Sequence, residues 1–422
     1  MTDRTVENAY QSARERYAEL GVDADAALAT LGGIPIALQC WQGDDVVGFE
    51  QAGGGASSGG IQVTGGFPGR ARTVAELRAD IATALSLIPG RHRLNLHAMY
   101  GEFGGKSVDR NALLPEHFAG WREWAAEQNC KLDFNSTCFS HPKADSGFTL
   151  SHRDPAIRRF WIDHVQQCRT ISAALGRAQG SPCMHDLWIP DGSKDLTVSR
   201  YEIRQLLLSS LEEIYGVTFN PTEMKDAVES KLFGIGSESF VVGSHEFYLA
   251  LAATRGLIPC VDLGHFHPTE SVADKISAML LFVPEILLHV SRGVRWDSDH
   301  VVILNDDVRA LAEEVVRSKQ LGRVHFALDF FDASINRVGA WVIGTRATQK
   351  GLLYALLEPT GRIREHEVAG DLFSRLALLE ECRTLPAGAV WDYFCLTMGV
   401  PPSDRWIEAV RAYETSVLRK RS

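Results

Sequence analysis

The sequence predicts an α/β fold, a (β/α)₈ barrel followed by a C-terminal α-helical extension. Short β-branched or apolar runs alternate with segments of helical period, as in chains built from βα units. Eight such runs precede a purely helical region, and eight strands are what this type of barrel needs. No GxGxxG motif follows the first run, so a barrel is favoured over an open doubly wound sheet, which stays the alternative.

The segments between the expected strands predict helices. The clearest is 73–88, where Thr73 and Glu76 have the spacing of a capping box, apolar side chains recur on one face, and Pro89 and Gly90 end the helix. In chain order, the expected strands are 36–40, 93–97, 131–135, 183–188, 227–231, 259–264, 285–290 and 324–329.

The same pattern divides the chain into three regions. Residues 1–30 predict an N-terminal helical segment outside the barrel, in which Tyr10, Ala13 and Tyr17 have helical spacing. The pattern assigns residues 31–342 to the catalytic barrel and residues 343–422 to the helical extension. We expect the extension to make oligomer contacts. Prolines separate the expected helices of the extension, which are 348–357, 369–383, 389–398 and 404–418.

Composition narrows the class of protein. With 45% hydrophobic and 23% charged residues, the 422-residue chain has the balance of a soluble globular protein, and its net charge of −10 disfavours nucleic acid or an anionic membrane as partner. The eight cysteines form no CxxC pair and are expected to be reduced and buried. Without an export signal or a membrane-length apolar run, a cytoplasmic enzyme is expected. The glycine-rich stretch 53–60 is either a mobile loop over the barrel mouth or a plain connector.

Polar side chains gather at the carboxyl ends of the expected strands, which is the end that carries catalysis in barrel enzymes. One buried histidine is more often a hydrogen-bonded core residue than a ligand, but this concentration at one end favours a functional site. The residues are His97, Asn135, His185, Glu229, Lys231, Asp262, His265, His267, His289 and Asp329.

Two local patterns indicate a metal site. A strand ends on Asp262, and the turn after it brings His265 back towards that carboxylate. Asp297 and Asp299 can reach one ion if their loop curls around it, although a solvated Asx turn explains this pair equally simply. Carboxylates with one or two imidazoles suit Mn²⁺, Co²⁺ or Mg²⁺ better than tetrahedral structural zinc, and the candidates are numerous enough for two ions that share a carboxylate.

A third pattern places an acid and an ammonium group together. Glu229 and Lys231 are two positions apart on an expected strand, so both side chains would point into the barrel lumen. They form either a structural ion pair or a site in which Lys231 polarises a substrate oxygen beside a metal.

Several motifs resemble those of the L-rhamnose isomerase family, and the resemblance runs nearly from end to end. They are CWQGDD at 40–45, NLHA at 95–98, WIPDG at 188–192, ESKLFG at 229–234, GHFHPTE at 264–270, RWDSDH at 295–300, LDFFDASINR at 328–337 and RAYE at 411–414.

The resemblance implies a pair of divalent ions in a barrel enzyme that is usually tetrameric. Mn²⁺ is the ion that the family prefers, with Co²⁺, Mg²⁺ or Zn²⁺ as substitutes. Asp262 would face both ions. The implied ligands are Glu229, Asp262, His289 and Asp329 for a structural ion, and His265, Asp297 and Asp299 for a catalytic ion.

The implied reaction interconverts L-rhamnose and L-rhamnulose, the first step of rhamnose catabolism, in a homotetramer. An isomerase for another aldose is the alternative, and a metal-dependent phosphoesterase or a sugar-binding protein without catalysis are further readings. A hydride shift is favoured over an enediol route, which needs a protein base near C1 or C2.

Particular side chains then receive roles. The catalytic candidates are Lys231, His97 and Asp329, with ring opening or a purely structural role open for His97. The expected substrate contacts are three aromatic side chains, for which core packing is the alternative, and one histidine: Trp41, Phe139, Trp188 and His267.

Overall fold

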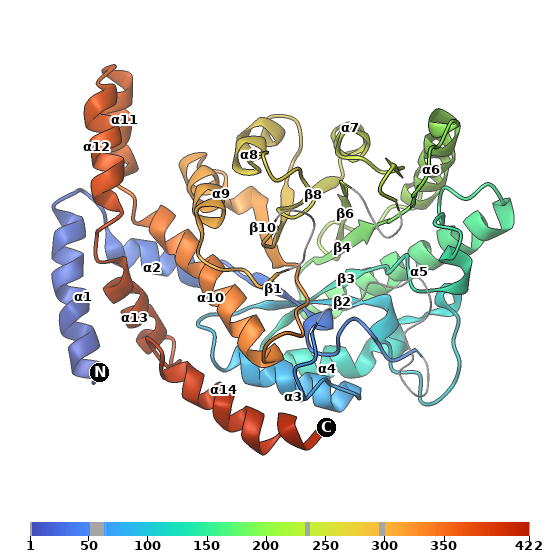
Figure 1. Cartoon of the computed structure of the whole chain (residues 1–422), viewed down its shortest axis with the longest axis horizontal. Coiled ribbons are helices and arrows are strands. Elements are labelled where there is room, and N and C mark those ends of the chain that lie inside the picture. The colour runs from blue at the N-terminus through green and yellow to red at the C-terminus, as the bar shows by residue number, and fades with distance from the viewer. Residues whose placement is uncertain (1, 51–62, 64, 233–236, 295–299, 422) are drawn as a thin grey trace.

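The structure is a computed structural model that describes residues 2–50, 63, 65–232, 237–294 and 300–421. Its centre is a closed parallel barrel in the order β1-β10-β9-β8-β6-β4-β3-β2, which confirms the predicted fold class (Figure 1). The predicted ligands Asp297 and Asp299 and the glycine-rich stretch 53–60 lie outside the described residues. The barrel strands are β1 (Ile36–Gln39), β2 (Arg93–His97), β3 (Lys131–Asn135), β4 (Cys183–Trp188), β6 (Met224–Glu229), β8 (Ile258–Asp262), β9 (Ile286–Val290) and β10 (Val324–Leu328).

One α-helix follows each barrel strand along the chain, and these helices surround the barrel (Figure 1). They are α3 (Val74–Leu85), α4 (Ala119–Glu127), α5 (Pro155–Gln179), α6 (Arg200–Tyr215), α7 (His245–Arg255), α8 (Ala273–Leu280), α9 (Asp306–Arg317) and α10 (Arg337–Leu356). A small antiparallel sheet of β5 (Gly192–Ser193) and β7 (Phe240–Val241), which the sequence pattern did not predict, lies in the loops after β4 and β6.

The predicted capping box of α3 is half formed. The Thr73 hydroxyl accepts the amide hydrogen of Glu76 at 3.2 Å, as the motif requires. The Glu76 carboxylate, however, accepts the amide hydrogen of Arg72 at 2.8 Å and also pairs with the Arg72 guanidinium. The charge on Arg72 explains why Glu76 turns towards it and not towards the backbone of Thr73.

Each barrel strand is buried on both faces, and alternate side chains point into the lumen. The inward positions deeper in the lumen are mostly small or apolar, so they form a floor beneath the polar residues at the strand ends. This floor comprises Ala37, Met184, Ala227, Ile258, Cys260, Leu287 and Ala327.

The strand β6 differs from its prediction at both ends. It begins at Met224 and ends at Glu229, so Lys231 belongs to the loop that follows and not to the strand. The expectation that Lys231 lies on the same strand as Glu229 is therefore wrong, and strand alternation does not set the direction of its side chain. The strand pairing with β8 stops at Glu229, because Glu229 pairs with Cys260 and no later pair is formed.

The helix α10 is longer than predicted, because the expected helix 348–357 is only its C-terminal half. Its first half is buried on nearly all sides and therefore carries no amphipathic signal. Trp341 of this half donates its indole N–H to the carbonyl oxygen of Gln39 at 2.9 Å, which ties the helix to the end of β1. The predicted domain limit between residues 342 and 343 falls inside α10, and the division into domains stays a prediction.

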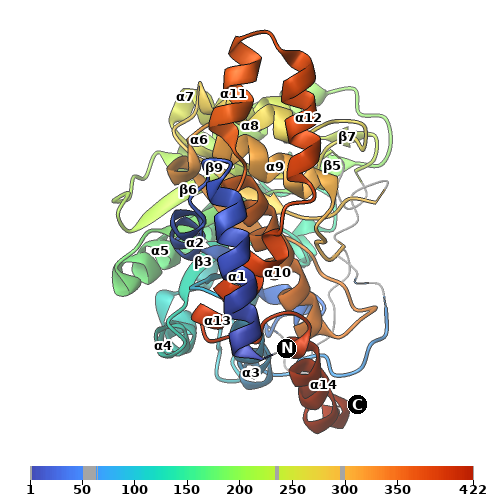
Figure 2. The same ribbon diagram turned by 90° about the vertical axis from the view of Figure 1, so that its left-hand side faces the viewer.

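The remaining helices lie outside the barrel, as Figures 1 and 2 show for both ends of the chain. Tyr10 stacks on Tyr393 with ring centroids 3.9 Å apart, which joins the N-terminal segment to the C-terminal extension. The helices α11 and α12 form a projecting hairpin, of which α11 was not predicted. Among the described helices, none is long and apolar enough to cross a membrane. The outer helices are α1 (Asp3–Ala18), α2 (Ala24–Gly32), α11 (Thr360–Val368), α12 (Leu372–Cys382), α13 (Ala387–Thr397) and α14 (Arg405–Ser416).

Candidate active site

Three carboxylates and one imidazole meet at the carboxyl end of the barrel, and the sequence predicted all four. Glu229 and Asp262 end β6 and β8, His289 lies one residue before the end of β9, and Asp329 directly follows β10. All four side chains are buried, and one ligand atom of each lies within 4.8 Å of the others. Strand alternation brings them together, since Asp262 and His289 are register partners on adjacent strands.

The His289 Nδ1 atom is the centre of this group. It lies 3.2 Å from Glu229 Oε1, 3.3 Å from Asp329 Oδ2 and 3.9 Å from Asp262 Oδ2. The Gln39 amide donates to Asp329 Oδ1 at 3.3 Å. Each carboxylate therefore directs an oxygen towards the same small volume.

Asp262 is oriented by two donors that the sequence reasoning did not identify. Its Oδ1 atom accepts the amide hydrogen of Gly264 at 2.6 Å and the hydroxyl hydrogen of Ser291 at 2.5 Å. Its Oδ2 atom is buried and has no hydrogen-bond partner among the described residues. Ser291 follows His289 by two positions, so the alternation of side chains along the strand could have predicted that it also points into the lumen.

The negative charge of this group is partly compensated within the protein. Burial lowers the pKa of His289, but Cys260, Glu229 and the hydrogen bond to Asp329 outweigh it and hold that pKa well above its usual value. Burial raises the pKa of Glu229, yet His289 and His265 hold it well below the usual range. Burial, aided by Asp329 and Glu229, raises the pKa of Asp262 to about 6.

The residues present fit a hard divalent cation. Buried carboxylates repel one another, and in the protein alone an imidazolium supplies the positive charge between them. A cation with oxygen and nitrogen ligands would replace that proton, and the unpartnered Oδ2 atom of Asp262 is directed at the same place.

His265 lies beside this group, as the prediction of a second ion requires. Its Nδ1 atom lies 2.8 Å from the Ser230 carbonyl oxygen and 3.2 Å from Glu229 Oε1. The side chain is buried. The other two ligands predicted for the second ion, Asp297 and Asp299, are outside the described residues, so its full ligand set stays a prediction.

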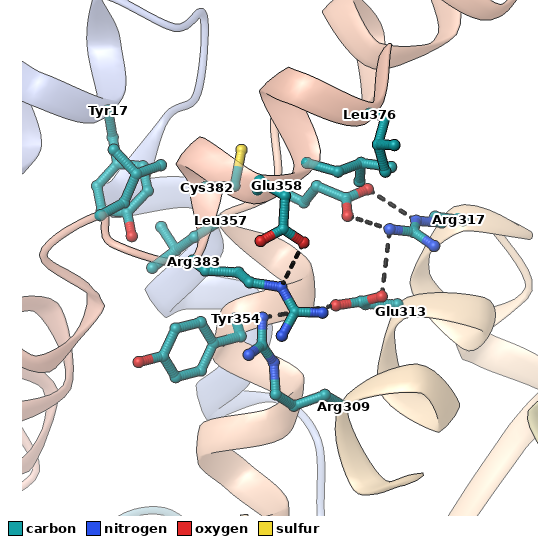
Figure 3. A pocket seen from close by; sticks show the side chains of 13 residues that line it. Tyr17, Arg309, Glu313, Arg317, Tyr354, Leu357, Glu358, Leu376, Cys382 and Arg383 are labelled. Carbon is teal, nitrogen blue, oxygen red and sulfur yellow. Dashed lines mark hydrogen bonds and ion pairs between the residues drawn. The ribbon is translucent and has the colours of Figure 1, made fainter. Parts of the chain in front are cut away.

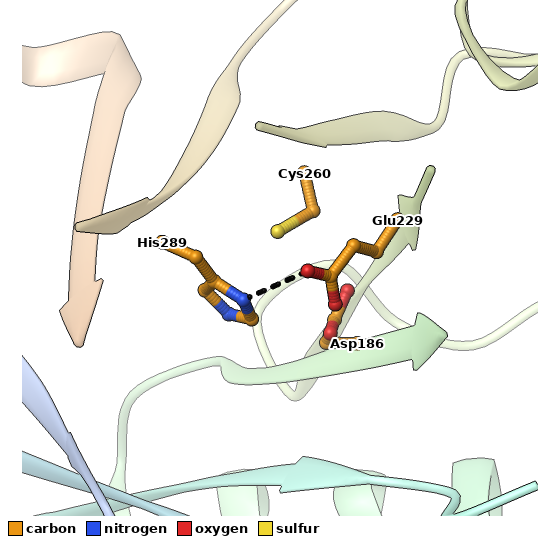
Figure 4. A group of neighbouring side chains, drawn as sticks. All are labelled: Asp186, Glu229, Cys260 and His289. Carbon is orange, nitrogen blue, oxygen red and sulfur yellow. Dashed lines mark hydrogen bonds and ion pairs between the residues drawn. The ribbon is translucent and has the colours of Figure 1, made fainter. Parts of the chain in front are cut away.

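A second group of possible ligands lies in the same lumen and was missed by the sequence reasoning. Asp186 and Cys260 join Glu229 and His289, again with one ligand atom of each within 4.8 Å of the others (Figure 4). The sequence analysis named His185 at this strand end, but the His185 ring faces Ser136 and Asp226 outside the lumen. A strand that is buried on both faces hides which of two neighbouring polar residues points inwards.

The three predicted aromatic contacts lie together at the barrel mouth. Phe139 is 5.3 Å from Trp188 and 6.3 Å from Trp41 between ring centroids. Phe331, which was not among the predicted contacts, packs edge-on against Trp41 at 5.6 Å. All three predicted rings are buried. We call these four rings the aromatic wall.

Many buried polar atoms at this end of the barrel have no hydrogen-bond partner among the described residues. Such atoms are rare in protein interiors, and here they share one region, as expected where a polar ligand completes the hydrogen bonding. They are Gln39 Oε1, Trp41 Nε1, Asn95 Oδ1, His97 Nε2, Asp186 Oδ1, Trp188 Nε1 and Asp262 Oδ2.

His97 stacks on Trp41 with ring centroids 4.2 Å apart. Its Nδ1 atom lies 3.1 Å from the Thr137 hydroxyl, which also accepts the amide hydrogen of Ala98 at 3.0 Å. Burial holds the pKa of His97 well below its usual value, so the imidazole is neutral. Arg110 donates to the carbonyl oxygens of Thr137 and Phe139, which fixes the turn that carries both residues.

Two predicted residues take less central positions. Lys231 is half-buried, and its Nζ atom lies 4.6 Å from the centre of the Trp188 ring. His267 is exposed, and its Nδ1 atom lies 2.7 Å from the Thr269 hydroxyl. Beyond His265 the chain has turned outwards, so His267 lines a neighbouring surface pocket of about 390 Å³ and not the buried site.

Another pocket, of about 200 Å³, lies between α1, α9, α10 and α12 (Figure 3). Its charged side chains pair with one another, as when Arg317 bonds Glu358 and Glu313. Such mutual pairing is typical of a structural ion network that joins the barrel to the outer helices. Among the described residues that line this pocket, Arg309 Nε is the one buried polar side-chain atom without a hydrogen-bond partner, whereas the barrel mouth has many.

The family model and the curated relatives agree on one family. The family model for L-rhamnose isomerase (RhaA) matches residues 4–421. The L-rhamnose isomerase of Rhodopirellula baltica is 56% identical over 99% of this chain and 97% of its own length, and that of Bacteroides thetaiotaomicron is 54% identical over 99% of both. Among solved structures, an L-ribulose 3-epimerase is 11% identical with a TM-score of 0.46, covering 79% of this chain and 97% of its own.

Asp262 predicts how cation affinity depends on pH. Its pKa of about 6 in the ion-free protein means that it is protonated below that pH, and a cation must then displace the proton. Because the cation also displaces the proton of His289, we expect Mn²⁺ affinity to fall with decreasing pH already near neutrality, and up to about tenfold more steeply per pH unit below about pH 6, measured by titration with electron paramagnetic resonance. Asp262→Asn should bind Mn²⁺ more weakly at neutral pH and lose this step. An affinity that stays constant between about pH 5 and 7 would contradict the prediction.

Proposed function

Because the chain belongs to the L-rhamnose isomerase family, we propose that it interconverts L-rhamnose and L-rhamnulose at the mouth of its barrel. The observation that carries the proposal is the buried group of Glu229, Asp262, His289 and Asp329 next to the aromatic wall. Metal ligands beside a stacking face are what an aldose–ketose isomerase of this kind needs, since the sugar must be held and its carbonyl polarised.

The proposed cofactors are two divalent ions, with Mn²⁺ preferred and Co²⁺, Mg²⁺ or Zn²⁺ as substitutes. Asp262 would face both ions. When bound, such ions supply Lewis acidity that polarises the carbonyl oxygen of the sugar and stabilises negative charge on the neighbouring oxygen. The proposed ligands are Glu229, Asp262, His289 and Asp329 for one ion, and His265, Asp297 and Asp299 for the other.

His97 is proposed to donate a hydrogen bond to the sugar during ring opening. The Thr137 hydroxyl has one hydrogen to donate, and among its described contacts the acceptor that remains for it is His97 Nδ1, since Ala98 is itself a donor. An imidazole that accepts at Nδ1 carries its hydrogen on Nε2. That atom is buried and has no partner among the described residues, so it can donate to a sugar oxygen.

The other residues hold the substrate. The Lys231 ammonium group is proposed to donate to a sugar oxygen, since the Trp188 ring supports its head group at the mouth. Trp41, Phe139 and Trp188 would contact the C–H faces and the methyl group and exclude water. Asp329 is proposed as both a ligand and a catalytic carboxylate. His267 is left out, because its side chain is exposed.

The hydrogen is proposed to move between C1 and C2 with its electron pair. An enediol route needs a protein base close to these carbons. His97 does not fit that role, because its only atom without a partner is the Nε2–H donor of the proposed tautomer. The hydride route needs only polarisation of the carbonyl and charge stabilisation, which the proposed ions and Lys231 supply.

A homotetramer in the cytoplasm completes the proposal. The hairpin of α11 and α12 exposes Val368, Leu372, Phe373 and Leu376, which supports contacts between subunits through the extension. The eight cysteines are all free, as expected in a reducing compartment.

Restoring metal to stripped enzyme tests the reaction. We expect protein treated with a chelator to be inactive and Mn²⁺ to restore ketose formation from L-rhamnose, with other aldoses converted less efficiently. The measurement is a ketose assay on a panel of aldoses. A better rate with another aldose would shift the assignment to an isomerase for that sugar, and no ketose from any sugar would reject the isomerase.

Isotope transfer tests the route. For a hydride shift, L-rhamnose labelled with deuterium at C2 should give product that keeps the label at C1 after turnover in ordinary water. The label would be read by nuclear magnetic resonance of the L-rhamnulose formed early in the reaction. Complete replacement of the label by solvent hydrogen would reject the direct transfer.

Replacing Thr137 tests the assigned tautomer of His97. Thr137→Val keeps the shape of the side chain but removes the hydroxyl group that donates to Nδ1, and we expect kcat to fall by about tenfold with little change in KM, as for one lost hydrogen bond. Thr137→Ser, which keeps the hydroxyl, should retain most of the activity. Equal losses of kcat in both variants would indicate that Thr137 acts only through packing.

A further inference from the structure

The lumen contains two overlapping groups of ligands that differ in one chemical respect. Both include Glu229 and His289. The first adds Asp262 and Asp329, and the second adds Asp186 and Cys260. Each group therefore has one imidazole and three ionisable acids, but a thiol replaces one carboxyl group in the second, which we call the sulfur group (Figure 4).

The sulfur group lies next to the first and slightly deeper in the barrel. Cys260 precedes Asp262 by two positions on β8, so both side chains point inwards and Cys260 belongs to the layer below. Cys260 is also the register partner of Glu229 on β6. The sulfur atom thus reaches Glu229 and His289 from the side of the floor.

Asp186 supplies a second and independent indication of a ligand. The side chain is buried, and the amide group of Asn135 donates to its Oδ2 atom at 3.1 Å. Burial and the neighbouring Glu229 carboxyl group hold the pKa of Asp186 well above its usual value. Its Oδ1 atom has no partner among the described residues. A buried carboxyl oxygen without a partner is costly, and Figure 4 shows this carboxyl group next to that of Glu229.

Ligand softness decides which cation each group prefers. Three carboxylates and an imidazole suit Mn²⁺ or Mg²⁺, whereas a thiolate favours softer cations such as Zn²⁺ and Cd²⁺. In a tetrahedral site with bonds of about 2.0–2.3 Å, ligand atoms lie roughly 3.3–3.8 Å apart. The atoms of the sulfur group lie within 4.8 Å of one another, so they have to approach by at most about 1.5 Å, which side-chain rotation can supply.

We propose that Asp186, Glu229, Cys260 and His289 form an inhibitory site for a soft divalent cation. The metal–sulfur bond forms as the thiol of Cys260 loses its proton to solvent, the carboxyl group of Asp186 releases its proton likewise, and no electron is transferred. Because an imidazole nitrogen binds one cation at a time, a soft cation bound here removes His289 from the hard cation and competes with it for Glu229. Binding rests on the geometry alone, whereas inhibition rests also on the proposed function.

Titration of the Mn²⁺-loaded enzyme with Cd²⁺ tests both parts. We expect the ultraviolet absorption band of cadmium–thiolate charge transfer to grow until one Cd²⁺ is bound per chain. Free Mn²⁺, detected by electron paramagnetic resonance, should appear over the same range, and isomerase activity should fall with it. If the enzyme makes no L-rhamnulose at all, the proposed function fails, but the absorption band still tests the site.

Variants identify the ligands. Cys260→Ala should lose the band and need at least tenfold more Cd²⁺ to release Mn²⁺, with Cys260→Ser as a second variant if the first folds poorly. Cys183→Ala is the matched control, since Cys183 is equally buried but packs against helices outside the lumen, and it should behave like the wild type. Asp186→Asn should keep the band but raise the Cd²⁺ concentration needed.

Four results would contradict the proposal. Absence of a thiolate band in the wild type would show that no cation binds the sulfur atom, and a band that persists in Cys260→Ala would show that another cysteine binds it. A band that forms without release of Mn²⁺ would show that the two groups do not compete for Glu229 and His289. Unchanged Cd²⁺ affinity in Asp186→Asn would remove Asp186 from the site.

Discussion

The mutual repulsion of carboxylates buried in the barrel lumen is the constraint on which the rest of the structure depends. Glu229, Asp262 and Asp329 are drawn together by strand alternation and are almost inaccessible to water. Such an arrangement is stable only with positive charge between the carboxylates, which the His289 imidazolium provides in the protein alone. The same charge requirement makes the group a place where a cation is expected.

The surroundings of the carboxylates hold them against this repulsion. Ser291 and Gly264 fix one oxygen of Asp262, and Gln39 fixes one of Asp329. Below them the floor of small and apolar side chains excludes water, so the electrostatic interactions are strong. At the mouth, buried ion pairs such as that of Arg110 with Glu50 hold the turns that present Phe139 and the partner of His97.

The sequence predicts those parts of the structure that leave a local pattern of apolar and polar residues. Strands were predicted to within a few residues because apolar runs between polar loops are distinctive, and Glu229, Asp262, His289 and Asp329 were found because they end such runs. Asp186 was missed, since its strand is buried on both faces and His185 beside it is equally polar. The first half of α10 was missed for the same reason, as burial all round leaves no helical period.

Contacts between distant segments were beyond any local pattern. Nothing near Arg110 indicates that it reaches the carbonyl oxygens at residues 137 and 139, and nothing near Cys260 indicates that its sulfur atom faces His289. The end of β6 illustrates a smaller error, because the extended appearance of Ser230 and Lys231 does not reveal that pairing with β8 has stopped.

The pairing of β1 with β10 closes the barrel, and the residue that directly follows β10 completes the group of ligands. Ile36 and Phe326 are register partners, so the sheet closes only when residues from near opposite ends of the barrel sequence have met. Asp329 directly follows β10. Among Glu229, Asp262, His289 and Asp329, it is the last to be synthesised. During translation, a nascent chain therefore has three of these ligands but neither the fourth nor the closing strand. The fourth ligand of this group and the strand that closes the barrel therefore become available together, so this set of four is complete only in a chain that can close its barrel.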